Sequence, residues 1–415
     1  MNNTSDKIPR DAMLVRFSLY GFLKNLRLFE PFLILFFRDA AMSFFQIGVL
    51  YAARNIATNL LEIPAGVFAD VFGRRRSMVL SFSAYIVSFV MFFTWPGFGP
   101  FIAAMIIFGL GEALRSGTHK ALILEYLRIQ ELEHLKAPYY GATRAASQIG
   151  SALNALLAAG LVFYTGDYRY VFLVSILPYT LDLINLATYP KSLDGDLQTL
   201  VWREIPAQIK ATTTTFLGLF RNPGALRAIF NSSGFDAFYK ATKDYLQPIL
   251  ETFALSLPIL VTLQDDRRSA LVIGGVYFII FLLSSYASRH AGAVSERIGN
   301  VGQAINMTFF LGAGLLGMAG VAAWADIPAL SILVFLGLYL LHNVRKPLNV
   351  AYISDQIENE VMASGLSVES QLVTLLGAVI APAVGALTDA FGVGAALAAL
   401  AFSMVGLAVI TRVAE

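Results

Sequence analysis

About a dozen long apolar runs, separated by short polar connections, constrain the fold more than any other feature of this sequence. A helix of about 20 apolar residues crosses the hydrocarbon core of a bilayer. The runs are too long and too uniformly apolar for the alternating strands of a membrane β-barrel, so they predict helices. The predicted spans are 14–38, 42–65, 77–95, 100–123, 143–164, 168–189, 227–254, 268–288, 302–324, 328–350, 366–389 and 391–411. The sequence therefore predicts an all-α membrane protein with 12 transmembrane helices.

Composition supports a membrane environment. The 415 residues are 57% hydrophobic and only 14% charged, whereas soluble domains carry about 25% charged residues. The absence of cysteine excludes disulfides and thiolate metal sites. A net charge of +2 without a basic tail gives no indication of nucleic-acid binding. We therefore expect the lipid bilayer as a partner, and neither a cofactor, a metal nor a nucleic acid.

The charge of the connections predicts the orientation in the membrane. Lysine and arginine are frequent in the connections after spans 2, 4, 6 and 8 and absent from those after spans 3, 9 and 11. Cytoplasmic loops carry the excess of these residues in membrane proteins. We therefore expect both termini and the even-numbered connections to be cytoplasmic, in a multi-pass protein of the cytoplasmic (inner) membrane. Arg38, Arg169 and the cluster 265–268 are exceptions to the pattern.

The two halves of the chain resemble each other. GVFADVFG (66–73) aligns with GAVSERIG (292–299), with a glycine, an acid and a glycine at matching positions. RSGTHKALILE (115–125) aligns with RKPLNVAYISD (345–355) in the same order. Because the matched turns lie on the same predicted side, the repeats are parallel and contain six helices each. We predict an N-terminal six-helix bundle at 1–189, a cytoplasmic linker at 190–226 and a C-terminal six-helix bundle at 227–415.

Residues 66–76, GVFADVFGRRR, follow the second predicted span. Together with six plus six helices, the pattern G-x-x-x-D-x-x-G-R-R-R resembles the major facilitator superfamily over essentially the whole chain. The resemblance implies the major facilitator fold and a conformational latch at this turn, in which a carboxylate faces the positive end of a helix in the other half. The gate residues are then Glu62, Gly66, Asp70, Gly73, Arg74, Glu296 and Arg297. The alternative is that the arginines only set the topology.

The sequence departs from two other patterns of this family. Proton-driven members often carry an arginine on the fourth helix before a G-x-G, but that place falls near Met105 here. Drug antiporters often carry a glycine-proline motif on the fifth helix, but GSALNALLAAG (150–160) has no proline. A partial version, GAVIAPAVG (377–385), falls on the eleventh span. Both departures argue against drug–proton antiport.

Ionisable side chains occur at membrane depth within four of the predicted spans. Such groups are costly in hydrocarbon, so we expect them to face a wet cavity and to be functional. At about 100° per residue they form one face on each of spans 1, 4, 7 and 10. These faces comprise Arg16, Tyr20, Lys24, Arg27, Glu30; Glu112, Arg115, Ser116, His119; Asp236, Lys240, Lys243, Asp244, Gln247; and His342, Arg345, Lys346, Asn349. In the repeat alignment Glu112 and Arg115 fall on His342 and Arg345. The family resemblance implies that these four helices line the central pathway.

From these faces we predict the residues of the site. The predicted substrate-binding residues are Tyr20, Lys24, Arg27, Glu112, Arg115, Lys240, Lys243, Arg345, Lys346 and Asn349. The candidates for carrying a coupling proton are Glu30, Glu112, Asp236 and Asp244. Structural alternatives remain open for some positions. Arg16 and Lys120 suit side chains that reach an interface, and His119 and His342 suit neutral packing rings.

The surplus of positive charge indicates the kind of substrate. Seven lysines and arginines and four acids of this set leave about +3, and arginine binds carboxylates and phosphates through paired hydrogen bonds. We therefore expect a secondary transporter that moves a small organic anion or zwitterion by alternating access, with protons as the coupling ion if it is coupled. The alternatives are a proton-coupled multidrug efflux antiporter and a lipid or headgroup flippase on the same fold. A monomer is expected, because each chain contains its own pathway.

Catalysis is not expected. The sequence has no H-E-x-x-H, no G-x-S-x-G and no phosphate-binding loop, and its four histidines are scattered. A receptor or scaffold would not need charged faces on all four pathway helices. The sequence therefore favours a transporter over an enzyme and over a receptor or scaffold.

Overall fold

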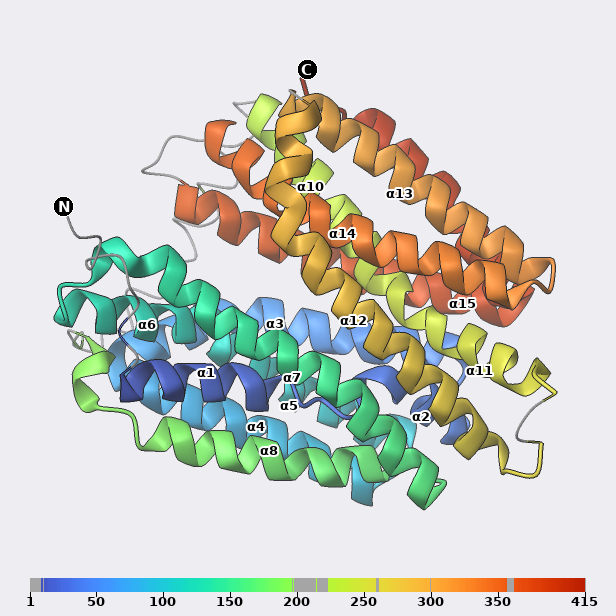
Figure 1. Ribbon diagram of the computed structural model, residues 1–415, viewed down its shortest axis with the longest axis horizontal. Helices are drawn as coiled ribbons and strands as arrows, with labels where there is room; N and C mark the ends of the chain where they lie inside the picture. The colour runs from blue at the N-terminus through green and yellow to red at the C-terminus, as the bar shows by residue number, and fades with distance from the viewer. Residues whose placement is uncertain are drawn as a thin grey trace. The chain divides into compact units, whose positions relative to one another are not determined.

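The computed structural model describes residues 9, 11–195, 197, 214, 223–258, 261–298, 300–356 and 362–414, without the side chains of 137, 288–298, 351, 354–356 and 362–367. Within these residues the chain is helical and contains no strand (Figure 1). The first helices are α1 (Ala12–Lys24), η1 (Glu30–Phe32), α2 (Leu33–Asp39), α3 (Phe44–Phe72), α4 (Arg74–Thr94), α5 (Phe98–Arg115), α6 (Thr118–Ile129), η2 (Glu133–Leu135), α7 (Lys136–Thr165), α8 (Tyr170–Ala187) and η3 (Lys191–Asp194). The remaining helices are α10 (Pro223–Thr242), η4 (Lys243–Tyr245), α11 (Leu246–Ser256), α12 (Asp265–Ile298), α13 (Val301–Trp324), α14 (Pro328–Gln356) and α15 (Met362–Ile410).

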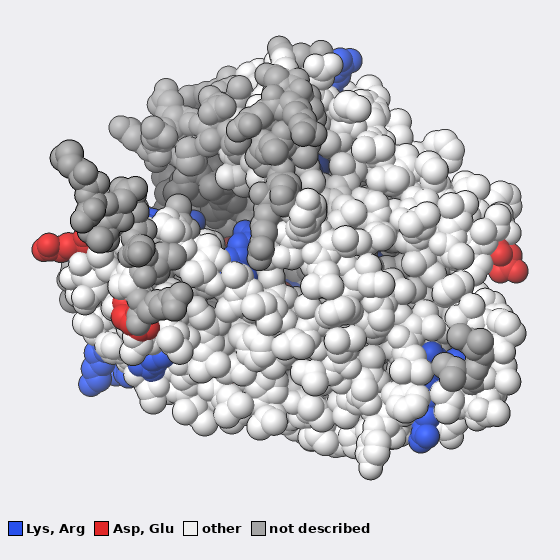
Figure 2. All heavy atoms as spheres, in the orientation of Figure 1, with Lys and Arg blue, Asp and Glu red and all other residues white. Residues whose placement is uncertain are grey.

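The prediction of an all-α fold with 12 transmembrane helices is confirmed. Most predicted spans correspond to one helix, and α15 contains the last two, which meet at Gly392 where φ is 83°. Eight of the described helical segments are long and apolar enough to cross a membrane by length and composition alone. In Figure 2, atoms of residues other than Lys, Arg, Asp and Glu cover a broad continuous area, as a surface in contact with lipid requires.

Three predicted spans are broken into two helices each: α1 and α2, α5 and α6, and α10 and α11. The first break contains Pro31, which has no N–H to donate. The second contains Gly117, whose φ of 71° is a left-handed conformation that glycine adopts without strain. The third is η4 itself, Lys243–Tyr245.

The breaks leave backbone carbonyls that cannot be solvated within a bilayer, so side chains must satisfy them. In the first break, Tyr179 OH donates to the Lys24 carbonyl at 3.2 Å, and the Asn154 amide donates to the Arg27 carbonyl at 3.0 Å. In the third, Tyr339 OH donates to the Lys243 carbonyl at 3.2 Å. The buried polar side chains beside the breaks therefore follow from the backbone geometry.

Contacts between Cα atoms divide the chain into two compact units, which we describe separately. Unit 1 comprises residues 1–30 and 57–205, and unit 2 comprises residues 31–56 and 206–415. The predicted domain boundaries stay a prediction, because most of the linker 190–226 lies outside the described residues. Helix α3 contributes to both units, since the division falls between Ile56 and Ala57.

In unit 1, α4 packs against α5 and α8, and α1 packs against α7 and α8. Aromatic rings fill the centre, where Tyr85 and Phe89 of α4 meet Tyr179 of α8 at centroid distances of 5.5 and 4.9 Å. The Ser81 hydroxyl donates to the Gly111 carbonyl at 2.6 Å, at a point where α4 and α5 approach closely. Small residues permit such contacts between membrane helices.

In unit 2, α15 packs against α10 and α13, and α14 packs against α12 and α13 (Figure 1). Residues 31–56 also belong to this unit: α2 contacts α11, and the first turns of α3 contact α15. Gly48 of α3 lies against the Ala381 backbone, and Gly385 of α15 lies against the Phe44 backbone. A Cβ at either glycine would collide with the opposing main chain, so the helices approach closely only because both residues are glycine.

Candidate functional site

Unit 1 brings together the charged residues predicted on its first and fourth spans. The Lys24 ammonium lies within electrostatic range of Arg27 and Glu30 from its own span and of Glu112 and Arg115 from α5. The Arg115 guanidinium donates through Nε to Tyr85 OH at 3.1 Å. The predicted residues therefore form one cluster, with a surplus of positive charge, beside the breaks in spans 1 and 4.

Tyr20 is another predicted member of this cluster, and its ring stacks on the imidazole of His119. The ring centroids are 3.5 Å apart and the planes differ by 16°. His119 Nε2 is buried and has no hydrogen-bond partner among the described residues. This environment fits the alternative in which His119 is a neutral packing ring.

Asp182 of α8 is a buried acid that the sequence analysis did not select. Its side chain is 0% exposed, and its Oδ1 accepts a 3.3 Å hydrogen bond from the Asn185 amide. Its Oδ2 has no hydrogen-bond partner among the described residues. Its only signal in the sequence is a lone aspartate within an apolar span, which forms no charged face like those of spans 1, 4, 7 and 10.

Unit 2 contains a small polar pocket of about 190 Å³. Its lining residues come from α10, α14 and α15: Ser232, Asp236, Lys240, Lys346, Asn349, Val350, Glu369, Ser370 and Val373. Four of them, Asp236, Lys240, Lys346 and Asn349, are residues that the sequence analysis placed in the site. The pocket therefore presents two ammonium groups and two carboxylates within a small volume.

The acids of this pocket are held by other side chains. Asp236 Oδ1 lies 3.3 Å from His342 Nε2, and the His342 ring stacks on Tyr239 at 3.9 Å. Glu369 accepts a short hydrogen bond from the Ser232 hydroxyl. Sequence reasoning missed Glu369 because it lies on the eleventh span, outside the charged faces of spans 1, 4, 7 and 10.

Lys243 and Asp244, at the break in span 7, pair with each other and do not line this pocket. Lys243 Nζ donates to Asp244 Oδ1 at 2.7 Å, and Tyr51 OH donates to Asp244 Oδ2 at 3.2 Å. Gln247, one turn further on, accepts the backbone N–H of Ile34 at 2.8 Å. These side chains connect the α10–α11 break to residues 31–56 of the same unit.

Arg345 is 1% exposed and does not line the pocket. Its Nη1 donates to the Ile305 carbonyl at 2.5 Å and to the Thr308 hydroxyl at 2.6 Å. Its Nη2 donates to Asn231, and its guanidinium lies 4.5 Å from the Phe235 ring centroid. Arg345 therefore joins α14 to α10 and α13 through neutral groups.

The predicted gate residues of unit 1 lie around the end of α3. Gly73 has a φ of 99° and lies against the Asp194 carboxylate, which accepts the backbone N–H of Arg75 at 2.8 Å. Arg74 lies 3.8 Å from Glu125 of α6. Asp194 thus occupies the positive N-terminus of α4, where a carboxylate is favourable.

Three other gate residues have different surroundings. Glu62 accepts a 3.0 Å hydrogen bond from Ser116, at the break in span 4. Gly66 has open space where a Cβ would lie, and Asp70 is exposed. The side chains of Glu296 and Arg297 lie outside the described part of the chain.

Unit 2 contains a carboxylate at a helix N-terminus that the sequence analysis did not select. Asp389 of α15 accepts the backbone N–H groups of Phe44 and Phe45, at 2.9 and 2.8 Å. These residues begin α3, so the carboxylate satisfies two of the N–H groups that a helix start leaves unpaired. The arrangement holds α3 to α15.

Among the described residues, no group of three histidines or acids is placed to hold a metal ion. The candidate site therefore consists of charged and aromatic side chains on broken membrane helices.

Comparisons with known proteins agree with this architecture. A family model described as Major Facilitator Superfamily matches residues 14–382. An uncharacterized MFS-type transporter, YxaM of Bacillus subtilis (strain 168), is 36% identical over 91 residues, which make up 22% of this chain and only 23% of that protein.

Three solved transporters share the fold at low sequence identity. The nucleoside transporter NupG has a TM-score of 0.77 at 12% identity, over 97% of this chain and 98% of that chain. A POT family transporter in complex with 5-aminolevulinic acid has a TM-score of 0.71 at 12% identity, over 96% and 95%. A D-xylose-proton symporter has a TM-score of 0.69 at 14% identity, over 94% and 96%. Because the family model covers most of the sequence, the chain belongs to the Major Facilitator Superfamily, a family of membrane transporters rather than enzymes.

Proposed function

We propose that this transporter moves a small zwitterion or organic anion across the cytoplasmic membrane. The observation that carries the substrate class is the unit 2 pocket, where Lys240 and Lys346 lie with Asp236 and Glu369. Opposite charges in one pocket complement a solute that carries both an ammonium and a carboxylate. A lipophilic cation would meet two ammonium groups there. The volume of about 190 Å³ also favours a solute smaller than a drug, since drug pockets span about 300–1,000 Å³.

The cluster of unit 1 supports the same substrate class. Lys24, Arg27 and Arg115 outnumber the acids Glu30 and Glu112 around them. Guanidinium groups bind carboxylates in a planar, paired geometry. We propose that the surplus of positive charge in this cluster suits a solute with an anionic group.

The mechanism we propose is alternating access, with both termini in the cytoplasm and one monomer as the functional unit. Its support is a difference between two carboxylates that could act as latches, Asp389 at the start of α3 and Asp70 near the end of α3. Asp389 accepts two backbone N–H groups, whereas Asp70 makes no hydrogen bond or ion pair with any described residue. We infer that the Asp389 contact belongs to one state of the transporter, and we propose that Asp70 forms a cytoplasmic latch in the opposite state. Transport would alternate between these two states.

We also propose that transport is coupled to protons. A coupling group must exchange its ionic partner between the two states, because a neighbouring charge sets its proton affinity. Asp236 meets this condition, since it contacts His342 and faces Lys240 and Lys346 within the pocket. We propose Asp236 as the proton carrier. Asp244 remains paired with Lys243 in this state.

A ligand screen by thermal shift tests the substrate class, because a ligand stabilises the state that binds it. Purified protein would be heated with amino acids, small carboxylates, organic phosphates and lipophilic cations. We expect stabilisation by the zwitterions or anions, and its loss in Lys240→Gln/Lys346→Gln. Arg227→Gln, an exposed cation outside the pocket, is the matched control and should retain the shift. Stabilisation by lipophilic cations that the lysine double variant retains would contradict the proposal.

A further inference from the structure

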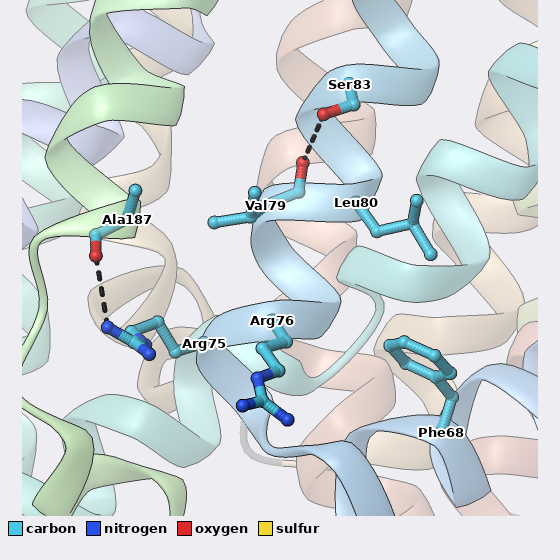
Figure 3. Close-up of a pocket in the computed structure, with 7 residues that line it drawn as sticks. All are labelled: Phe68, Arg75, Arg76, Val79, Leu80, Ser83 and Ala187. Atoms are coloured by element: carbon cyan, nitrogen blue, oxygen red, sulfur yellow. Dashed lines mark hydrogen bonds between the residues drawn. The ribbon is translucent and has the colours of Figure 1, made fainter.

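A second cavity, of about 380 Å³, lies in unit 1 and shares no residue with the predicted transport site. Its lining residues are Phe68 of α3, Arg75, Arg76, Val79, Leu80 and Ser83 of α4, and Ala187 of α8. Two rows of α4 residues spaced by four, 75/79/83 and 76/80, lie side by side, so they form one face of that helix. Figure 3 shows the two arginines at one end of the cavity, with Phe68 and Leu80 on one side of it.

Both arginines lie at the N-terminal end of α4, where a candidate membrane span begins. They belong to the first turn of α4, at the start of the candidate membrane span Arg74–Thr94. Ser83 lies seven residues beyond Arg76, about 10 Å deeper along the helix. The cavity therefore extends from a basic rim at the interface into an apolar region, and Leu80, 42% exposed, forms part of its wall.

Toward the described residues, the two guanidinium groups use little of their hydrogen-bonding capacity. Arg75 Nη1 donates to the Ala187 carbonyl at 3.2 Å, and this is the only hydrogen bond of the guanidinium to a described residue, whereas the group has five donors. Arg76 is exposed, and its guanidinium makes no hydrogen bond or ion pair within the described part of the chain. The nearby Asp194 carboxylate accepts the Arg75 backbone N–H at 2.8 Å and forms no ion pair with either guanidinium.

We propose that this cavity binds an anionic phospholipid of the adjoining leaflet, with its phosphodiester at Arg75 and Arg76. Guanidinium groups bind phosphate oxygens through paired hydrogen bonds, and basic pockets between membrane helices bind anionic headgroups. Phe68 and Leu80 would then contact the start of an acyl chain. A free phosphate would gain nothing from this apolar wall, so the shape of the cavity favours the lipid.

Native mass spectrometry with added phosphatidylglycerol or phosphatidylcholine tests the proposal. We expect the wild type to retain phosphatidylglycerol in preference to phosphatidylcholine. Each arginine near the surface contributes about 1 kcal/mol, so Arg76→Gln should weaken binding about fivefold and Arg75→Gln/Arg76→Gln about thirtyfold. Arg75→Lys/Arg76→Lys keeps both charges and should retain more lipid than the glutamine pair.

Arg144→Gln/Arg227→Gln is the matched control, since it removes two exposed arginines outside the cavity. Equal lipid retention in this control and in the Arg75→Gln/Arg76→Gln protein would overturn the proposal. Equal retention of both lipids by the wild type would also overturn it. If inorganic phosphate protected the protein from heating as well as phosphatidylglycerol did, the site would be one for free phosphate and not for lipid. Should the double variant fail to fold, Arg76→Gln alone decides the question, because the side chain it removes is exposed.

Discussion

The ring of Tyr239 lies flat against the imidazole of His342, with centroids 3.9 Å apart and planes 10° apart. Unit 1 contains the same kind of pair, Tyr20 with His119, again between the first and fourth spans of a repeat. The two histidines do not correspond in the repeat alignment, where His342 falls opposite Glu112. Only the His342 pair has an acid at ion-pair distance among the described residues, so the two pairs are chemically unequal.

Asp236→Asn tests the importance of that acid for coupling. The amide keeps the shape of the side chain but carries neither a charge nor a transferable proton. We expect substrate uptake driven by a pH gradient to fall about tenfold or more. Exchange of substrate across the membrane at equal pH should continue. Proteoliposomes loaded with a ligand from the thermal-shift screen would measure both. Asp244→Asn is the matched control, and driven uptake at the wild-type rate in Asp236→Asn would contradict the assignment.

Arg345→Lys tests whether that arginine joins helices in unit 2. Lysine cannot reproduce the fork of donors that reaches Ile305, Thr308 and Asn231. Each buried acceptor left unpaired costs about 1–3 kcal/mol. We expect a loss of stability of about 3 kcal/mol in total, seen as a clearly lower midpoint of thermal unfolding in detergent. A midpoint equal to that of Arg227→Gln, where the arginine is exposed, would mean that Arg345 does not join these helices.

The sequence predicted the helices well because span length and apolar content are set by the bilayer. Predicted span 302–324 became α13, Val301–Trp324, and predicted span 77–95 became α4, Arg74–Thr94. The breaks in spans 1, 4 and 7 were not predicted. A break does not change the hydropathy of a span when its freed carbonyls accept hydrogen bonds from side chains distant in sequence. The Asn154 amide, which donates to the Arg27 carbonyl, is an example.

The site was predictable where helical periodicity determines it. Asp236, Lys240, Lys346 and Asn349 share faces of α10 and α14, and all four line one pocket. Glu369 could not be found in this way, because its place beside them depends on how α15 packs against α10. For the same reason periodicity placed Arg345 on the correct face of span 10 without revealing that its partners are protein groups.

Asp389→Asn should weaken the closed latch of unit 2. The neutral amide has one acceptor oxygen for two backbone N–H groups, and it loses the attraction of a carboxylate for the start of α3. We expect the population with this latch open to rise about tenfold. The chain has no cysteine, so a maleimide would report on Ala381→Cys alone, at the buried contact with α3.

Labelling of Ala381→Cys should therefore be faster in Asp389→Asn than in the parent. Asp167→Asn is the matched control, since its carboxylate bonds to Arg169 at the start of α8 and to neither α3 nor α15. Equal rates in the two aspartate variants would mean that Asp389 does not act as a latch.

Asp70→Asn should have the opposite effect on the same probe. If Asp70 stabilises the state opposite to the one in which the Asp389 contact is formed, its removal favours the state with that contact. A carboxylate at a helix N-terminus contributes about 0.3–1 kcal/mol, so labelling of Ala381→Cys should fall about two- to fivefold. Glu133→Gln removes an exposed acid paired with Lys136 and should leave the rate unchanged. A faster rate in Asp70→Asn would rule out the proposed cytoplasmic latch.

Gly48 offers a steric test of the same contact. A valine there would press against the Ala381 backbone, and a main chain cannot move aside as a flexible side chain can. Helices α3 and α15 would have to separate, so we expect Gly48→Val to lower the midpoint of thermal unfolding and to accelerate labelling of Ala381→Cys. Gly66→Val is the matched substitution on the same helix, at a position where a Cβ meets nothing within 4 Å. Because the α3–α15 contacts of the described residues lie in the first half of α3, as at Gly48 and at Asn55 beside Gly377, Gly66→Val should not accelerate labelling. Acceleration by both variants would mean that valine acts by loosening α3 itself and not through its contact with α15.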